Sequence, residues 1–263
     1  MEIRRIEENG MEGSRAEKGK TEENYADDGR CAAGGRERKE EDRKLAVRYV
    51  PHLRYDFREP FPLAGIGYTV NRSRAGSPSC RRFLEPPKSG VVFEYAFYYD
   101  FDIQHLYDLE QSFVYLDREG HITGVESSFH GKFLNSLIRD VTEFEQDHPV
   151  LYVQPGKHAF FPAPEYFRLV IDRDTACLEE AGKDGFLVAP MFEGRLFTDA
   201  EKDRKVEAYI REHFAFTPSW EFTERGPDGR RTEELLMPYE ELDRMIVCRL
   251  TALEEKMEIK KST

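Results

Sequence analysis

The stretch Gly90-Val-Val-Phe-Glu-Tyr-Ala-Phe-Tyr-Tyr99 is the strongest strand signal in the sequence. It is dense in β-branched and aromatic residues, which favour strands. Its nearly continuous apolar character predicts a strand that is buried on both faces. Two further strands are expected at 111–117 and 122–129, joined by Arg118-Glu119-Gly120. A three-residue loop that ends in glycine is typical of a β-hairpin, and this loop would place Asp117 opposite His121.

The last third of the chain changes from strand patterns to helix patterns. Thr198 and Glu201 have the spacing of a capping box and predict a helix at about 198–214. A second helix is expected at about 238–259, after a proline at its first turn. Its apolar face would consist of Leu242, Met245, Ile246, Leu250, Leu253 and Met257. Such stripes predict helices that pack on the sheet.

The remaining segments set the domain organisation. Residues 148–158 predict a strand that runs into a Pro-Gly turn, and 166–172 and 185–189 are weaker strand candidates. Residues 1–44 contain almost no large apolar side chains and many charges, so we expect a disordered charged tail. Residues 45–263 are expected to form a single domain that is mainly β, with the C-terminal helices packed on it.

Bulk composition excludes several functional classes. The net charge is −12, which argues against a nucleic-acid binder because phosphate contacts need a clustered cationic surface. No apolar run approaches the ~20 residues that span a membrane, and the first residues lack the apolar core of a signal peptide, so we expect a cytoplasmic protein. The cysteines form no C-x-x-C pair and are expected to be reduced thiols: Cys31, Cys80, Cys177 and Cys248. The oligomeric state stays open.

A cluster of metal-type ligands follows the strongest strand directly. The carboxylates and imidazoles between residues 100 and 130 are the residue types that a divalent cation requires. The candidates are Asp100, Asp102, His105, Asp108, Glu110 and His130. The expected hairpin register would set Glu110 opposite Ser128 and Asp108 opposite His130, with all four side chains on one face. The carboxylate-rich set favours Mg²⁺, Ca²⁺ or Mn²⁺, and two imidazoles would move the preference toward Mn²⁺ or Zn²⁺.

The heptapeptide Gln104-His-Leu-Tyr-Asp-Leu-Glu110 resembles the Gly-His-Arg-His-Asp-Trp-Glu motif of the necrosis-inducing-protein-like (NLP) cytolysins. The match covers His105, Asp108 and Glu110, whereas Tyr107 and Leu109 differ from the motif. The resemblance implies that these positions, with an upstream Asp100 or Asp102, hold a divalent cation in a β-sandwich. NLP cytolysins recognise sphingolipid head groups, so the resemblance also implies a polar ligand such as a glycan or a lipid head group.

A second resemblance covers roughly residues 91–162. The chain is similar to proteins related to vacuolar-protein-sorting proteins, which share an aromatic strand, a His-Gly pair like His130-Gly131 and a segment like His148-Pro-Val-Leu-Tyr-Val-Gln-Pro-Gly-Lys-His158. Both families belong to one broad superfamily. Together the two resemblances imply an antiparallel, jelly-roll-like β-sandwich.

Three functions follow as alternatives. In the first, the ion is held by His105, Asp108 and Glu110 and grips the hydroxyls or phosphate of a head group or glycan. In the second, the protein is a metal-dependent hydrolase in which His130 or His158 acts as general acid or base. In the third, the metal is purely structural. A hydrolase should have a deep pocket with a non-ligand histidine in reach, whereas a binding module needs only an accessible ion.

Overall fold

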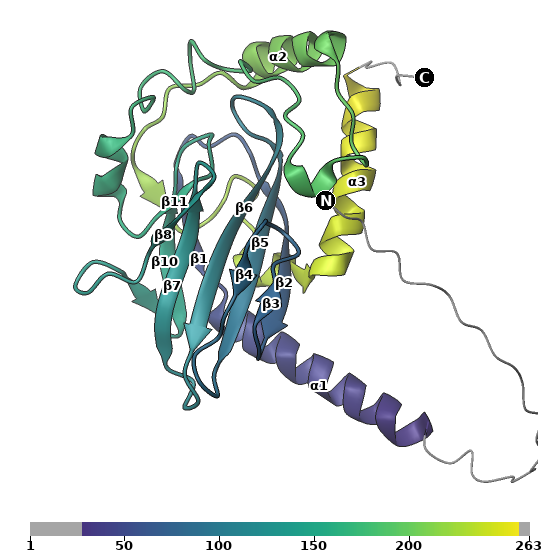
Figure 1. Cartoon of the computed structure of the whole chain (residues 1–263). Coiled ribbons are helices and arrows are strands. Elements are labelled where there is room, and N and C mark those ends of the chain that lie inside the picture. The colour runs from purple at the N-terminus through teal and green to yellow at the C-terminus, as the bar shows by residue number, and fades with distance from the viewer. Residues whose placement is uncertain (1–27, 258–263) are drawn as a thin grey trace, which may run out of the picture. The chain divides into compact units, whose positions relative to one another are not determined.

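The structure is a computed structural model that describes residues 28–257, with side chains from residue 37 onward. The chain divides into two units, with the boundary between Glu40 and Glu41. Helix α1 spans Asp28–Tyr49 (Figure 1). The part of the expected tail from residue 28 is therefore helical, because its Ala, Arg, Glu and Lys residues favour a helix even without an apolar face. Residues 1–27 lie outside the described residues.

The larger sheet of the described chain has six strands in the order β13-β2-β5-β6-β7-β8 (Figure 1). These strands are β2 (Leu63–Asn71), β5 (Val91–Phe101), β6 (Leu106–Leu116), β7 (Ile122–Phe129), β8 (Lys132–Asn135) and β13 (Leu236–Pro238). β5 lies between β2 and β6 and is antiparallel to both. The strongest strand of the sequence is thus central in the sheet.

The second sheet is formed by β11, β10, β1 and β12 in that order, with β9 paired to β10. Its strands are β1 (His52–Asp56), β9 (Phe144–Glu145), β10 (His148–Val153), β11 (Phe160–Phe161) and β12 (Phe222–Thr223). A separate pair consists of β3 (Ala75–Gly76) and β4 (Phe83–Leu84).

The two large sheets share one apolar core. Phe97 of β5 meets Phe160 of β11 edge to face, with ring centroids 5.1 Å apart. The hydroxyls of Tyr55 on β1 and Tyr99 on β5 are hydrogen-bonded at 3.0 Å. Such contacts between opposed faces define a sandwich. The expectation of a mainly β, sandwich-like fold with C-terminal helices is confirmed.

Helix α3 (Tyr239–Lys256) covers the other face of the larger sheet and packs on β2 and β5 (Figure 1). Leu242, Ile246 and Leu250 are buried, so the expected apolar stripe is the packed face. β5 is therefore buried on both faces, as its apolar sequence predicts. Within residues 28–257, no helix is long and apolar enough to cross a membrane.

Helix α2 (Ala200–Phe214) begins one residue later than its capping box suggests. The cap is Asp199, whose carboxylate accepts hydrogen bonds from the backbone N–H groups of Glu201 and Lys202, both at 2.9 Å. Thr198 instead donates to Asp203 at 2.6 Å. An ionised cap is favoured here because it also faces the positive end of the helix dipole.

Two expected strands are wrong. Residues 166–172 lie largely in a 3-10 helix, η1 (Pro164–Leu169), because a proline at its first turn favours helical geometry. Residues 185–189 contribute only one isolated bridge, between Gly185 and His105. Two further 3-10 turns are η2 (Pro190–Phe192) and η3 (Thr232–Leu235).

The hairpin register is correct at the turn and wrong beyond it. The backbone N–H of Asp117 donates to the carbonyl of His121 at 3.0 Å, as expected. Pairing then shifts between Leu116↔Ile122 and Tyr115↔Gly124, so β7 carries one extra residue. This β-bulge puts Ser112 opposite Ser127 and displaces the expected Asp108/His130 and Glu110/Ser128 pairs by one position.

A substitution at Gly67 on β2 tests how closely α3 packs on the sheet. A Cβ atom at this position would lie 2.7 Å from Leu242 Cδ2 and 3.1 Å from the backbone of Tyr239, so α3 would have to move. We expect Gly67→Ala to lower the free energy of unfolding by about 1–3 kcal/mol, measured by urea denaturation. Gly76→Ala is the control, because its Cβ would meet only one atom, at 3.9 Å. Equal stability of both variants would contradict the close docking of α3.

Candidate functional site

A cavity of about 330 Å³ lies where β6 begins, beside the turn between β7 and β8. The polar residues that line it are Asp102, His105, Tyr107, Asp108, Glu110, Gln111, Ser128, His130, Lys157 and Asp184. The structure therefore brings together four of the five predicted metal ligands and one of the two predicted catalytic histidines. His158 lies behind this wall rather than on it.

Asp100 is the predicted ligand that lies elsewhere. Its two carboxylate oxygens accept hydrogen bonds from Arg249 of α3 at 2.7 and 2.5 Å. Side chains alternate along a strand, and Asp100 shares the α3-facing side of β5 with Tyr98. Asp102 follows after β5 has ended at Phe101 and the chain has turned. Asp100 is therefore removed from the candidate ligand set.

Asp102 is held by a tight loop between β5 and β6. Its carboxylate accepts a hydrogen bond from the backbone N–H of Gln104 at 2.6 Å, and its own N–H donates to the carbonyl of His105 at 2.9 Å. Lys157 Nζ lies 3.3 Å from the same carboxylate and 2.7 Å from Gln104 Oε1. Burial alone would raise the pKa of Asp102, but the ammonium of Lys157, aided by His105, holds it below its usual range.

His105 is oriented as metal-bound histidines are. Its Nδ1 donates to the carbonyl of Tyr107 at 2.8 Å, which leaves the lone pair on Nε2. Nε2 lies 3.8 Å from Asp102 Oδ1, too far for a hydrogen bond. A backbone carbonyl that fixes the tautomer in this way is a common second partner of a metal-bound imidazole. His105 can therefore offer Nε2 to a cation beside Asp102.

Asp108 is positioned from behind by His158. His158 is fully buried, donates from Nδ1 to Asp108 Oδ2 at 3.2 Å and stacks on Tyr99 with ring centroids 3.7 Å apart. Its Nε2 lies 3.6 Å from Glu59 and has no hydrogen-bond partner within the described chain. Burial lowers the pKa of His158, but Asp108 and Glu59 outweigh it and raise the pKa to about 9. His158 is thus a buried imidazolium at neutral pH.

Glu110 lies two residues further along β6 and is only 8% exposed. Ser128 of β7 donates a hydrogen bond to its Oε2, so these two side chains meet despite the shifted register. Burial, and next the negative charge of Asp108, raise the pKa of Glu110 to about 8. At neutral pH the carboxyl group holds a proton that a cation would displace.

His130 occupies the exposed rim of the cavity. Its Nε2 donates to Gln154 Oε1 at 2.9 Å. Left-handed backbone conformations occur at two residues of this wall, Tyr107 (φ 51°) and His130 (φ 47°), and at His158 behind it (φ 57°). Positive φ is uncommon for residues other than glycine and concentrates at functional sites.

Two carboxylates of this cluster are close enough to share an ion. One atom each from Asp102, Asp108 and His158 lie within 4.8 Å of one another. Oxygen ligands of Ca²⁺ lie roughly 2.3–2.6 Å from the ion, so two ligands of one ion are at most ~5 Å apart. The spacing of Asp102 and Asp108 therefore fits a single cation, whereas His158, which donates to Asp108 from behind the wall, is not a ligand.

A second group of metal-type ligands lies on β1, β10 and η3: His52, His148 and Glu233. Its two imidazole rings stack face to face, with centroids 3.9 Å apart and planes inclined by 14°. An imidazole binds metal in the plane of its ring, so these rings would have to turn before both could bind one ion. His52 is instead shared between Glu145 at 2.5 Å and Glu233 at 3.0 Å.

Sequence reasoning missed two charged residues of the site. Lys157 directly precedes His158 in the sequence. Because His158 was a predicted site residue, its neighbour Lys157 could have been predicted as well. Glu59 offered no such signal. It is buried between β1 and β2, where it accepts hydrogen bonds from the backbone N–H groups of Gly156 at 2.8 Å and Phe61 at 3.2 Å.

Comparison with solved structures finds partial likenesses to NLP proteins. One is necrosis and ethylene inducing protein 2 from the causal agent of cocoa's witches' broom disease, at 20% identity over 44% of this chain and 66% of that chain, with a TM-score of 0.30. Another is NLPPya in complex with glucosamine, at 17% identity over 44% of this chain and 64% of that one, with a TM-score of 0.32. The alignments thus span less than two thirds of either protein.

No protein-family model matches the chain, and no curated protein matches its sequence.

The raised pKa of Glu110 predicts that the stability of the metal-free protein depends on pH. A carboxyl whose pKa is raised on folding stabilises the protein while it is protonated, and this contribution is lost as pH rises from its unfolded pKa through about 8. Relative to Glu110→Gln, the wild type should lose about 2–4 kcal/mol of unfolding free energy between pH 5 and pH 9, measured by urea denaturation with chelator present. Exposed Glu119→Gln is the control and should follow the wild type. Parallel curves for wild type and Glu110→Gln would contradict the raised pKa.

Proposed function

We propose that the cavity holds one divalent cation between Asp102, Asp108 and Glu110, with His105 as a nitrogen ligand. Through this ion the protein would bind the hydroxyls or phosphate of a small polar ligand, such as a glycan or a lipid head group. A mixed set of carboxylates and one imidazole favours Mn²⁺, Mg²⁺ or Ca²⁺, with Zn²⁺ as a weaker candidate.

The observation that carries this proposal is the charge at the base of the cavity. Four carboxylates, of Glu59, Asp102, Asp108 and Glu110, surround two cationic groups, of Lys157 and His158. When all six groups are ionised, two negative charges are left over. Buried charge without compensation is costly, so the site favours either protons or a divalent cation.

The other residues of the cavity fit a ligand rich in hydroxyl groups. Lys157, Ser128 and His130 offer hydrogen bonds around the carboxylates, while Leu187 and Met191 give the wall an apolar side. A few polar groups on a largely preformed, partly apolar wall are typical of small-molecule sites. An ion here would contact both the protein and a ligand, which favours binding over a purely structural metal.

The geometry gives less support to a hydrolase. His158 is a buried imidazolium behind Asp108 and does not line the cavity, so we assign it the positioning of Asp108. His130 lines the exposed rim of the cavity, and because its Nε2 donates to Gln154, only its Nδ1 is left to accept a proton. A general base needs a free nitrogen within reach of the reacting water.

Metal binding is tested by titrating chelator-treated protein with Mn²⁺ in a calorimeter. We expect a single site, and Asp108→Asn should weaken it about 100-fold, which corresponds to ~2.7 kcal/mol. Asp100→Asn is the matched control: it removes the same charge from the same segment, but its carboxylate faces Arg249, so it should leave the affinity unchanged. Lack of Mn²⁺ binding by the wild type, or equal losses in both variants, would contradict the site.

The ligand class has a separate test. Glucosamine and phosphocholine, titrated into the Mn²⁺-loaded protein, probe hydroxyl and phosphate chemistry respectively. At least one should bind with the ion present and fail to bind after chelation, because the ion supplies the main contact. Binding that is equally strong without the ion would contradict recognition through the metal.

A further inference from the structure

A second cavity, of about 170 Å³, lies beside η1 and shares no lining residue with the cation cavity. The residues that form it are Glu165, Phe167, Arg168, Arg173, Trp220 and Phe222, with Pro164 at its edge. Two guanidinium groups meet three aromatic rings here, in a protein whose net charge is −12. Two arginines in one small cavity are unexpected in so acidic a chain, and their position there suggests a chemical role.

The loop that carries Trp220 is anchored on a buried carboxylate. Asp56 is 2% exposed and accepts hydrogen bonds from the backbone N–H groups of Trp220 at 2.6 Å and Ser219 at 3.1 Å. The hydroxyl of Ser219 adds a third bond at 3.1 Å. Trp220 itself has φ 58°, a left-handed conformation that is unfavourable for a bulky residue. The anchor therefore holds the indole in a strained position at the cavity wall.

The indole fixes the guanidinium of Arg173. Arg173 Cζ lies 4.2 Å from the Trp220 ring centroid, a close cation–π contact. Its Nε–H is buried and has no hydrogen-bond partner within the described chain. The nearest carboxylate, that of Asp174, is 4.0 Å away and 82% exposed. A buried donor without an acceptor is costly. No hydrogen bond links the terminal N–H groups of this guanidinium to another described residue either, so these groups can bind an oxyanion.

The charges around the cavity favour a single anionic group. Arg168 lines the same cavity and forms no salt bridge within the described part of the chain. Glu165 brings one opposing negative charge, so the cavity has a net charge of one positive unit. Phe167 and Phe222 are stacked, with centroids 5.8 Å apart, and provide an apolar wall for the organic part of a ligand.

We propose that this cavity is a second ligand site, which binds one oxyanion group, a carboxylate or a phosphate, of a small molecule. Arg173 donates from the terminal N–H groups of its guanidinium, Arg168 adds positive charge, and the aromatic rings cover the ligand's apolar part. This site does not depend on the proposed cation site.

Trp220 is the single tryptophan of the chain, so intrinsic tryptophan fluorescence reports on this cavity alone. Inorganic phosphate and acetate are titrated into the full-length protein at constant ionic strength, with chloride as the reference anion. We expect a saturable change with at least one of the two oxyanions. Tighter binding of phosphate would indicate a phosphate ester as the natural ligand, and tighter binding of acetate would indicate a carboxylate.

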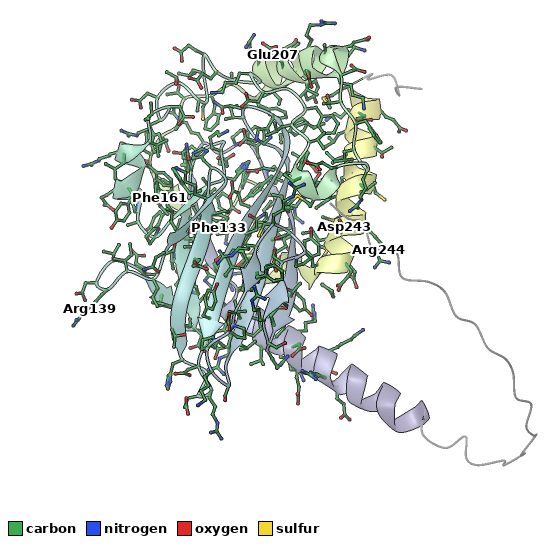
Figure 2. All side chains as sticks on the ribbon, in the orientation of Figure 1. Phe133, Arg139, Phe161, Glu207, Asp243 and Arg244 are labelled. Atoms are coloured by element: carbon green, nitrogen blue, oxygen red, sulfur yellow. The ribbon has the colours of Figure 1, made fainter. Side chains whose placement is uncertain are left out.

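Two variants separate the pocket from general charge effects. Arg168→Gln leaves the Arg173–Trp220 stack in place and should weaken oxyanion binding about threefold to tenfold through the loss of one nearby charge. Arg173→Gln removes the proposed donor and should weaken it about tenfold or more, measured by calorimetry because the fluorescence itself will change. Arg139→Gln is the control, since Arg139 lies on an exposed loop (Figure 2) and does not line this cavity.

Asp108→Asn should bind the oxyanion like the wild type, which distinguishes failure of this site from failure of the cation site. Two results would overturn the proposal. One is the lack of a saturable response to either oxyanion in the folded wild type. The other is equal affinity in Arg173→Gln and Arg139→Gln, with both variants shown to be folded by circular dichroism.

Discussion

The hydrogen bond between Asp108 and His158 joins the two sheets at the point where the cation cavity opens. Asp108 belongs to β6, and His158 follows β10 in the opposite sheet. The imidazole is enclosed by Tyr99 on one side and Glu59 on another, so it stays charged inside the core. A buried imidazolium requires partner carboxylates, and that requirement fixes where Asp108 and Glu59 lie. The position of the Asp108 carboxylate in the cavity thus follows from the packing of the two sheets against each other.

The same arrangement explains why the cavity remains electrostatically incomplete. His158 and Lys157 each neutralise one carboxylate from the protein side, and Asp102 is drawn to Lys157. Glu110 is left with only a serine hydroxyl, and its carboxyl group therefore holds a proton near neutral pH. A divalent cation that displaces this proton would balance the charge of the cluster. Binding of the ion and deprotonation of Glu110 are therefore expected to be linked.

The sequence was sufficient to predict the parts of the fold that depend on local patterns. The aromatic strand before Asp100, the hairpin turn at Gly120 and the apolar stripe of α3 all follow from periodicity and turn chemistry. Asp102, His105, Asp108 and Glu110 meet because they are close in the chain. Asp100 was misplaced because its partner, Arg249, lies on α3, about 150 residues away in the sequence, and because local patterns do not fix the residue at which β5 ends.

Features that depend on distant segments could not be read from the sequence. The bulge in β7 shifts the hairpin register after correct pairing at the turn, and its one local signal is Gly124, an isolated glycine inside the strand. Glu59 enters the site from the end of β1, far from the heptapeptide, and only the closed sandwich brings it to His158. The pocket around Trp220 combines three separate segments, each of which looks like an ordinary loop.

The most direct test of the cation site is a crystal structure of the Mn²⁺-soaked protein, with anomalous diffraction recorded at the manganese edge. We predict one strong anomalous peak inside the cavity, bounded by carboxylate oxygens of Asp102, Asp108 and Glu110 and by Nε2 of His105. A peak at His52 and His148 instead, or a cavity in which Lys157 and water satisfy the carboxylates and no manganese is present, would contradict the central claim.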